Sequence, residues 1–258
     1  MNCLRCRLYV FAALAGPLMA QTAFEVATIK PVDPDAQAGR YITMKSTHQL
    51  VAKNHTVRTL IMAAYYLHTR AVVGGPSWAD TDRFEIQAVT PGEGRPSTDE
   101  QMAMIRKLLT DRFHLVFHRE PKEMPVYAIV PAKSGPKLGE ANTPADKAPI
   151  LAVHMFPDHV EFPARNATML DFVSVLQRAA MDRPVVDRTG LKGRYDFDLV
   201  WTPDDSQFGG LKFAEPADGP RKPDLYAAMQ QQLGLRLEAT KAPVDILVID
   251  RVDRPTEN

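Results

Sequence analysis

Apolar residues recur at helical spacing in two segments of the chain, and each segment follows an Asn-x-Thr triplet. Val57, Leu60 and Ile61 begin the first stripe, and Met169 and Phe172 begin the second. Both stripes follow the i, i+3, i+4, i+7 order of an amphipathic helix. The polar residues in front of them are of types that cap helices. Two helices at equivalent places in the two halves are therefore predicted.

The caps of these helices can be predicted from short-range spacing. Thr168 and Asp171 have the spacing of a capping box, in which each residue bonds the backbone N–H of the other. In the first half, either Asn54 or Thr56 can cap the helix.

A strand pattern follows each helix. A valine pair stands at 72–73 and again at 185–186, and each pair leads through a glycine-containing stretch to alternating apolar residues and a final Thr-Pro. Alternation predicts a strand with one buried and one exposed face. The alternating residues are Phe84, Ile86 and Ala88 in the first half and Phe197, Leu199 and Trp201 in the second.

A second helix and two further strands complete each half. Ser97 and Glu100 have capping-box spacing before the first of these helices. Pro125 and Pro243 precede the last strands, at places where a strand can begin without losing a ladder hydrogen bond. The predicted helices are 101–110 and 225–233, the closing strands are 113–117, 126–130, 235–237 and 244–249, and alternating segments at 41–51 and 151–162 precede the first helices.

The order of elements repeats at an interval of about 112 residues. It predicts an α+β fold made of two pseudo-repeated units of roughly β(β)αβαββ that pack together. A chance coincidence of common patterns is the alternative, but order, spacing and several residue identities agree. The predicted divisions are a signal peptide at 1–20, a first unit at 21–133, a linker at 134–149 and a second unit at 150–258 with a flexible insertion at about 207–223.

The N-terminus has the order of a secretory signal peptide. Arg5 and Arg7 precede an apolar run and then small residues down to Ala20, after which cleavage is expected, with Ala23 as the alternative. An uncleaved membrane anchor is the competing interpretation, but the apolar run is much shorter than the roughly 20 residues that cross a bilayer. We therefore expect a secreted or periplasmic protein with no stable membrane insertion after cleavage.

The charge of the chain restricts its possible partners, and its cysteine content restricts the disulfides and metal ligands that it can form. The chain has 31 Lys+Arg and 31 Asp+Glu, and loss of Arg5 and Arg7 leaves a formal charge of about −2. This balance does not favour nucleic acid as a partner. Because Cys3 and Cys6 both lie in the predicted signal peptide, the mature chain is expected to have neither disulfides nor cysteine ligands.

Four segments resemble those of a known family. They are 24–31 (FEVATIKP), 74–84, 119–127 and 183–195. The family is a soil-associated domain of unknown function, expanded in acidobacterial genomes, usually exported and in some members joined to a membrane sensor peptidase of the beta-lactam-sensing type. The resemblance covers nearly the whole mature chain and implies membership without implying an activity. Nothing in the chain matches the peptidase portion or its zinc motif.

The residues offer little catalytic chemistry. His114 and His118 have a ligand-like interval, but the segment around them alternates as a strand, where Cα atoms four residues apart are roughly 13 Å from each other. Nucleophile-elbow, phosphate-loop and zinc-helix motifs do not occur. Gly74-Gly75-Pro76 is more typical of a turn than of an anion cradle. No catalytic residue, metal or cofactor is therefore predicted.

The residues best suited to ligand contact are two tryptophans and two arginines, because these types dominate binding hot spots. They are Trp78, Arg83, Arg194 and Trp201. Burial in the core is the stronger interpretation for Trp201, which continues an alternating strand. The favoured function is an exported, non-catalytic binding or interaction module of the cell envelope, whose partner is an envelope protein or a small ligand. The alternative is a secreted or periplasmic hydrolase with a site in the cleft between the repeats.

Overall fold

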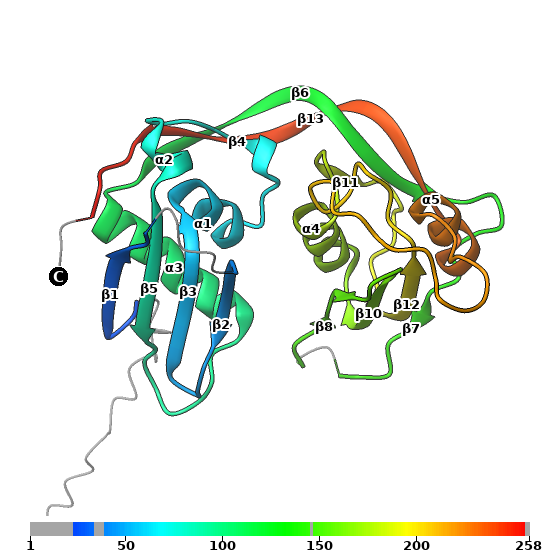
Figure 1. The fold of residues 1–258 in the computed structure, drawn as a ribbon, viewed down its shortest axis with the longest axis horizontal. Helices are drawn as coiled ribbons and strands as arrows, with labels where there is room; N and C mark the ends of the chain where they lie inside the picture. Colours follow the sequence, from blue (N-terminus) through cyan, green and yellow to red (C-terminus); the bar gives the residue numbers. More distant parts are fainter. Residues whose placement is uncertain (1–22, 34–38, 145–146, 256–258) are drawn as a thin grey trace, which may run out of the picture.

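Two lobes joined by a pair of long strands make up the molecule (Figure 1). The structure is a computed structural model that describes residues 23–33, 39–144 and 147–255. The predicted signal peptide lies outside the described residues. Helices and strands are mixed along the chain, and the described strands form three sheets. The predicted α+β class is therefore confirmed.

The first lobe contains an antiparallel sheet in the spatial order β1-β5-β3-β2. The segment predicted at 41–51 is divided into a hairpin, whose turn is closed by a hydrogen bond from Lys45 N to Gln49 O. The strands are β1 (Val26–Pro31), β2 (Tyr41–Met44), β3 (Gln49–Thr56) and β5 (Arg83–Val89). The helices are α1 (Val57–Ala64), η1 (Thr69–Ala71), α2 (Trp78–Thr81) and α3 (Thr98–Phe113).

The second lobe contains a sheet in the corresponding order β7-β12-β10-β8, with β9 also paired to β10. Its strands are β7 (Gly139–Glu140), β8 (Ile150–Leu151), β9 (His154–Met155), β10 (Val160–Ala167) and β12 (Tyr195–Trp201). Its helices are α4 (Met169–Ala179), α5 (Leu225–Ala228) and η2 (Met229–Leu233).

A third sheet joins the lobes. Its spatial order is β11-β6-β13-β4, and the two inner strands form the arch of Figure 1. The short outer strands β4 and β11 run parallel to their neighbours, whereas the inner pair is antiparallel. The strands are β4 (Val72–Gly74), β6 (Val116–Pro131), β11 (Val185–Asp187) and β13 (Leu235–Arg251).

The long strands correct the prediction that each half closes with two separate strands. β6 and β13 are continuous, and Pro125 and Pro243 lie inside them, opposite Lys241 and Glu123. A proline is tolerated there because, in the described sheets, each strand has only one partner at that point, so its missing N–H is not needed on the outer side.

Each long strand contributes to both hydrophobic cores. Ile129, near the end of β6, is buried in the core of the second lobe, although β6 begins in the first. Leu247 and Ile249, near the end of β13, are buried in the core of the first lobe. The two halves of the chain thus exchange their final strands. A cooperative unit that includes both lobes follows from this arrangement, because neither core is complete without the other half.

Local conformation also corresponds between the halves. Asn54 and Asn166 both adopt positive φ, at 59° and 54°, beside a register shift in β3 and β10. Two residues later, Thr56 and Thr168 cap α1 and α4. Of the two residues predicted as possible caps of α1, Thr56 is the cap, and Asn54 lies at the bulge. The capping box of Thr168 is confirmed.

The helix α3 is longer than predicted. It begins at the capping box formed by Ser97 and Glu100, as expected, but continues to Phe113 and is terminated by His114 in the left-handed conformation. The segment 113–117 is therefore not a strand, because its first residue ends the helix and β6 begins only at Val116. Phe113 continues the buried stripe of Ile105 and Leu109 and is fully buried in the first core, which explains why the helix extends beyond Thr110.

The predicted linker and insertion both contact the second lobe. β7 lies within 134–149 and pairs with β12. In the stretch 207–223, Phe208 N donates to Ala180 O and Ala214 N donates to Pro157 O. Both segments are therefore anchored on the second lobe. Among the helices of the described ranges, none combines the length and the apolar character needed to cross a bilayer.

Candidate functional site

The structure divides the four residues predicted to bind a ligand between the lobes, with Trp78 and Arg83 in the first and Arg194 and Trp201 in the second. Trp201 is 0% exposed, and its Nε1 donates to Gln207 Oε1 at 2.7 Å. It is a core residue, as its alternation indicated, and cannot contact a ligand in this conformation. Trp78 begins α2 and is half-buried against the first core, with the Arg254 guanidinium 4.9 Å from its ring centroid.

The two predicted arginines occupy corresponding places, one in each lobe. Arg83 donates to Asn54 Oδ1 at 3.4 Å, and Arg194 donates to the backbone oxygen of Asn166 at 2.8 Å. Each arginine therefore contacts the asparagine at the strand bulge of its own lobe. These contacts are structural, because they hold each arginine against the strand bulge.

His114 and His118, the pair with the ligand-like interval, each lie beside an aspartate. His114 Nδ1 lies 3.2 Å from Asp253 Oδ2, and His118 Nδ1 lies 2.8 Å from Asp250 Oδ1. Each histidine thus faces a separate carboxylate. Within the described part of the chain, no three or more His, Cys, Asp or Glu side chains are grouped so that they could hold a metal ion.

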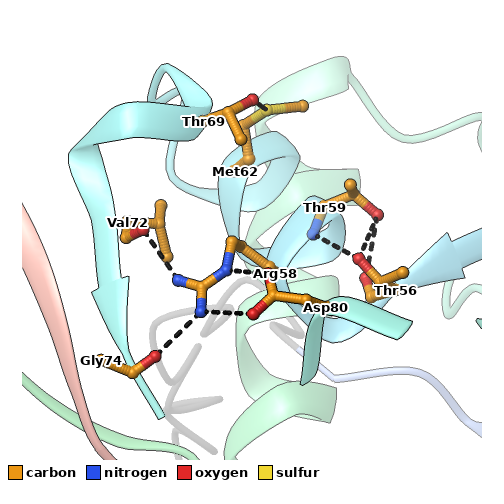
Figure 2. Close-up of polar contacts among 8 residues, drawn as sticks. All are labelled: Thr56, Arg58, Thr59, Met62, Thr69, Val72, Gly74 and Asp80. Carbon is orange, nitrogen blue, oxygen red and sulfur yellow. Dashed lines mark hydrogen bonds and ion pairs between the residues drawn. The ribbon is translucent and has the colours of Figure 1, made fainter. Parts of the chain in front are cut away.

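A hollow of about 480 Å³ lies on the first lobe. Figure 2 shows that Arg58, one of the arginines that line it, reaches from the first turn of α1 between β4 and α2. The guanidinium donates to Val72 O at 2.7 Å and to Gly74 O at 2.9 Å, and it forms a two-point ion pair with Asp80. The lining residues are Arg40, Asn54, Thr56, Arg58, Thr59, Thr69, Asp80 and Arg83.

These bonds assign Arg58 a structural role. All three guanidinium nitrogens are used, two acceptors are backbone carbonyls and the third is a carboxylate that neutralises the charge. The position of Arg58 in α1 corresponds to that of Leu170 in α4, which is 73% exposed. The second lobe therefore lacks this tie between helix and strand.

A second pocket, of about 300 Å³, lies where the two lobes meet. We refer to it as the inter-lobe pocket. Strand β2, the end of α1 and the start of α3 form its walls from the first lobe, and Arg178 of α4 closes it from the second. Its lining residues are Ile42, Thr43, Met44, Ala63, Tyr66, Arg95, Thr98, Gln101, Met102 and Arg178.

Arg178 is the most unusual group in this pocket. It is half-buried, its Nε donates to Ser174 O at 2.8 Å, and its guanidinium carbon lies 5.3 Å from the centroid of the Tyr66 ring. Among the described residues no carboxylate forms an ion pair with it. Burial lowers the pKa of Arg178 below its ordinary value, which reflects the cost of holding a desolvated cation.

Tyr66 is held in place beside this arginine at both of its ends. Its backbone has a φ of 56°, its hydroxyl donates to Asp99 Oδ1 at 2.6 Å, and its carbonyl accepts a hydrogen bond from Gln177 Nε2 at 3.1 Å. Burial, followed by the hydrogen bond to Asp99, raises the pKa of Tyr66. The hydroxyl is therefore protonated at neutral pH and acts as a fixed donor.

The lobes also meet beside the pocket. His68 Nε2 lies 3.2 Å from Met181 O, while its Nδ1 accepts from Arg70 N at 3.1 Å. The proton therefore belongs on Nε2, which donates across to the second lobe. Burial lowers the pKa of His68 and favours this neutral form. The inter-lobe contact thus uses a neutral histidine and adds no positive charge to that of Arg178 and Arg95 at the pocket.

The sequence predicted a cleft between the repeats only as the site of the hydrolase alternative, and it did not identify the residues of the inter-lobe pocket. Arg178 and Tyr66 are separated by about 112 positions in the chain, and each stands just where an ordinary helix ends. Arg95 lies in a polar loop before α3 and is exposed. In the sequence, Tyr66 and Arg178 are linked by their equivalent positions in the two halves. A two-fold arrangement of the halves brings such positions together.

The fold and the pocket define a protein of two corresponding α+β lobes with a small cationic pocket between them. The sequence profile of the family described as "Protein of unknown function (DUF3738)" matches residues 58–252. The chain belongs to this family. No curated protein and no solved structure matches the chain.

Proposed function

We propose that the chain is a non-catalytic binding module of the cell envelope, and that its inter-lobe pocket binds a small anionic group attached to an apolar one. The observation that carries this proposal is the half-buried guanidinium of Arg178, which the described residues leave without a carboxylate. A buried charge is costly unless it is paired. A bound anion would supply the missing partner through charge-assisted hydrogen bonds.

The rest of the lining supports an amphipathic ligand. Arg95, which makes no hydrogen bond or ion pair with the described residues, adds a second cation. Ile42, Met44 and Met102 supply an apolar wall, and methionine adapts well to varied shapes. The volume of about 300 Å³ lies at the lower end of the usual range for ligand sites. A carboxylate with a short apolar chain fits this combination.

Binding is better supported than hydrolysis. The hydroxyls in the pocket belong to Thr43, Thr98 and Tyr66, and the described lining contains no histidine or carboxylate. The carboxylate that accepts from Tyr66, Asp99, lies outside that lining and raises the pKa of the hydroxyl that it contacts. The raised pKa of Tyr66 also makes it a poor nucleophile at neutral pH. A hydrolase would use the same inter-lobe position, but the described lining of the pocket does not pair a reactive hydroxyl with a general base.

The envelope location is proposed from the N-terminal pattern of arginines, apolar residues and small residues. An exported module with a net formal charge near neutrality would meet soluble ligands and envelope proteins rather than nucleic acid.

Hexanoate is a suitable probe, because it joins a carboxylate to a short apolar chain. We expect the chain from residue 21 onward to bind hexanoate saturably in isothermal titration calorimetry and to bind 1-hexanol, which lacks the charge, at least about tenfold more weakly. Arg178→Gln should abolish the heat signal, and Arg95→Gln should weaken it. Arg165→Gln is the matched control, because Arg165 is also half-buried but pairs with Asp198 and does not line the pocket. Equal binding of the acid and the alcohol would disprove the proposal.

A further inference from the structure

Strand β2 forms one wall of the inter-lobe pocket and is also an edge of the first sheet. An edge strand has backbone N–H and C=O groups that face away from its neighbour. Lys45 N donates to Gln49 O, so by the alternation of an antiparallel ladder Thr43 opposite Val51 is also a hydrogen-bonded pair. The backbone groups of Ile42 and Met44 therefore point outward, away from β3.

The β2 edge also lacks the features that protect other edges. Its sequence is Tyr-Ile-Thr-Met, with no charge and no proline. By contrast, β1 ends in Lys30 and Pro31, and the outer sides of the long strands carry Pro121 and Pro243 among charged residues. Prolines and charges of this kind prevent pairing with another chain. In the described sheets, β2 is the edge that combines an unprotected backbone with an adjacent cationic pocket.

The side chains of β2 indicate on which face of the sheet the side chains of an added strand would lie. Met44 and Ile42 pack on the core side of the sheet, toward the cluster that contains α1 and α3. Residues of an added strand that lie opposite them would point to the same side, because paired residues share a face. That side is the inter-lobe pocket, whose wall includes Ala63 and Met102 from the helices. Backbone pairing and apolar burial would therefore occur together.

We infer that the occupant of the pocket is the carboxyl end of an extended peptide, which pairs with β2 and places its terminal carboxylate against Arg178 and Arg95. This inference rests on the proposed function, because it names the ligand class of the same pocket. Strand addition supplies main-chain hydrogen bonds, and alternate side-chain pockets supply specificity. A free α-carboxylate is the one anion that every peptide carries at the end of an extended backbone. The partner is accordingly a protein or peptide with an exposed, apolar C-terminal tail.

The test compares peptides that differ in one feature at a time. The probe is the acetylated pentapeptide Gly-Thr-Val-Ala-Val with a free carboxyl group. We expect it to bind the chain from residue 21 onward at least about tenfold more tightly than hexanoate, because it adds backbone hydrogen bonds. The same peptide with a C-terminal amide should lose at least about tenfold in affinity, because the charge is absent.

Two further peptides test the strand addition itself. Methylation of every second backbone nitrogen in one register should abolish binding, whereas methylation in the other register should have little effect, since alternate N–H groups face away from the partner strand. In hydrogen exchange followed by NMR, the amides of Ile42 and Met44 should become protected when the free-acid peptide binds. Arg95→Gln should weaken the peptide without changing the fold, because Arg95 is exposed and makes no ion pair with the described residues.

The outcomes separate this inference from the proposed function. If hexanoate binds but the pentapeptide binds no more tightly, or if both methylated registers bind equally, strand addition is wrong while the anion site stands. If the amidated peptide binds as well as the acid, the role assigned to the carboxylate is wrong. If neither hexanoate nor the peptide binds, both proposals are wrong. If Arg178→Gln weakens peptide binding and Arg165→Gln does not, the result supports the inference.

Discussion

Arg178 and His55 carry ionisable groups that are partly or fully buried, and burial changes the pKa of each. Arg178 keeps its charge at the inter-lobe pocket with an aromatic ring and a carbonyl as its neighbours. His55 shows the other response to burial. Its ring is 6% exposed, and burial, assisted by the positive charge of Arg40, lowers its pKa from 6.5 to about 4. The guanidinium stays charged because its intrinsic pKa is very high, whereas the imidazole becomes neutral.

The pKa of His55 predicts a loss of stability in mild acid. The folded state resists protonation down to about pH 4, while the unfolded state takes up a proton below about 6.5. The unfolded state therefore binds more protons as the pH falls through this window, and the free energy of unfolding decreases by about 2 kcal/mol between pH 7 and pH 5 on account of this group. Urea unfolding at the two pH values measures the change.

The comparison that isolates His55 uses two variants. His55→Gln removes the titrating ring and should reduce the loss between pH 7 and pH 5 by about 2 kcal/mol, whatever its effect at pH 7. His154→Gln removes an exposed ring in β9 and should leave the loss unchanged. An identical pH dependence in the wild-type chain and in His55→Gln would contradict this prediction.

At the scale of elements, the helices begin where the side chains satisfy the first backbone N–H groups. Ser97 and Glu100 form a reciprocal pair at the start of α3, and Thr168 and Asp171 form one at the start of α4. Burial of the pattern residues then determines how far each helix continues. Phe113 is the last residue of α3 because His114 adopts the left-handed conformation.

Removal of the α3 cap should destabilise the protein. Ser97→Ala leaves the N–H of Glu100 without its acceptor, and a lost cap of this type costs about 1 kcal/mol. Thr110→Ala is the control within the same helix, because Thr110 is exposed and alanine has the higher helix propensity. It should change the free energy of unfolding by less than about 0.5 kcal/mol. Chemical denaturation measures both, and a Ser97→Ala effect no larger than the control would refute the role of the cap.

At the scale of the whole molecule, the exchange of β6 and β13 determines how the lobes are held together. The ladder between them pairs Met124 with Ala242 near its middle, and these positions correspond in the two halves. The residues before and after this pair in the ladder are therefore related by an approximate two-fold axis that passes through it. Each lobe receives its last core strand from the other half of the chain, with Ile129 in one core and Ile249 in the other.

This exchange predicts that a chain cut between the halves stays assembled. A protease site inserted after Asn142, which is exposed, allows the folded protein to be cleaved in one place. We expect the two fragments to elute together at an unchanged volume in size-exclusion chromatography and to separate in denaturant, because the β6–β13 ladder and both cores join them. Separation in native buffer would show that the exchange does not hold the lobes together.

The sequence by itself determined the local features. Apolar periodicity located α1 and α4, alternation located β5 and β12, and short-range spacing identified the capping boxes of Ser97 and Thr168. These features depend on residues within a few positions of one another. Alternation also placed Trp201 in the core, because the same face of its strand was apolar throughout.

Only the tertiary structure decided which segments meet. The continuity of β6 through Pro125 depends on the absence of a second neighbouring strand, which local sequence does not encode. The pairing of Tyr66 with Arg178 depends on the relative placement of two lobes. The charge of Arg178, for which the described residues supply no carboxylate, follows from the same placement, because burial and partners are properties of the assembled surface. The candidate site therefore lay beyond sequence reasoning for a physical reason, since its residues acquire their chemistry only when the two halves come together.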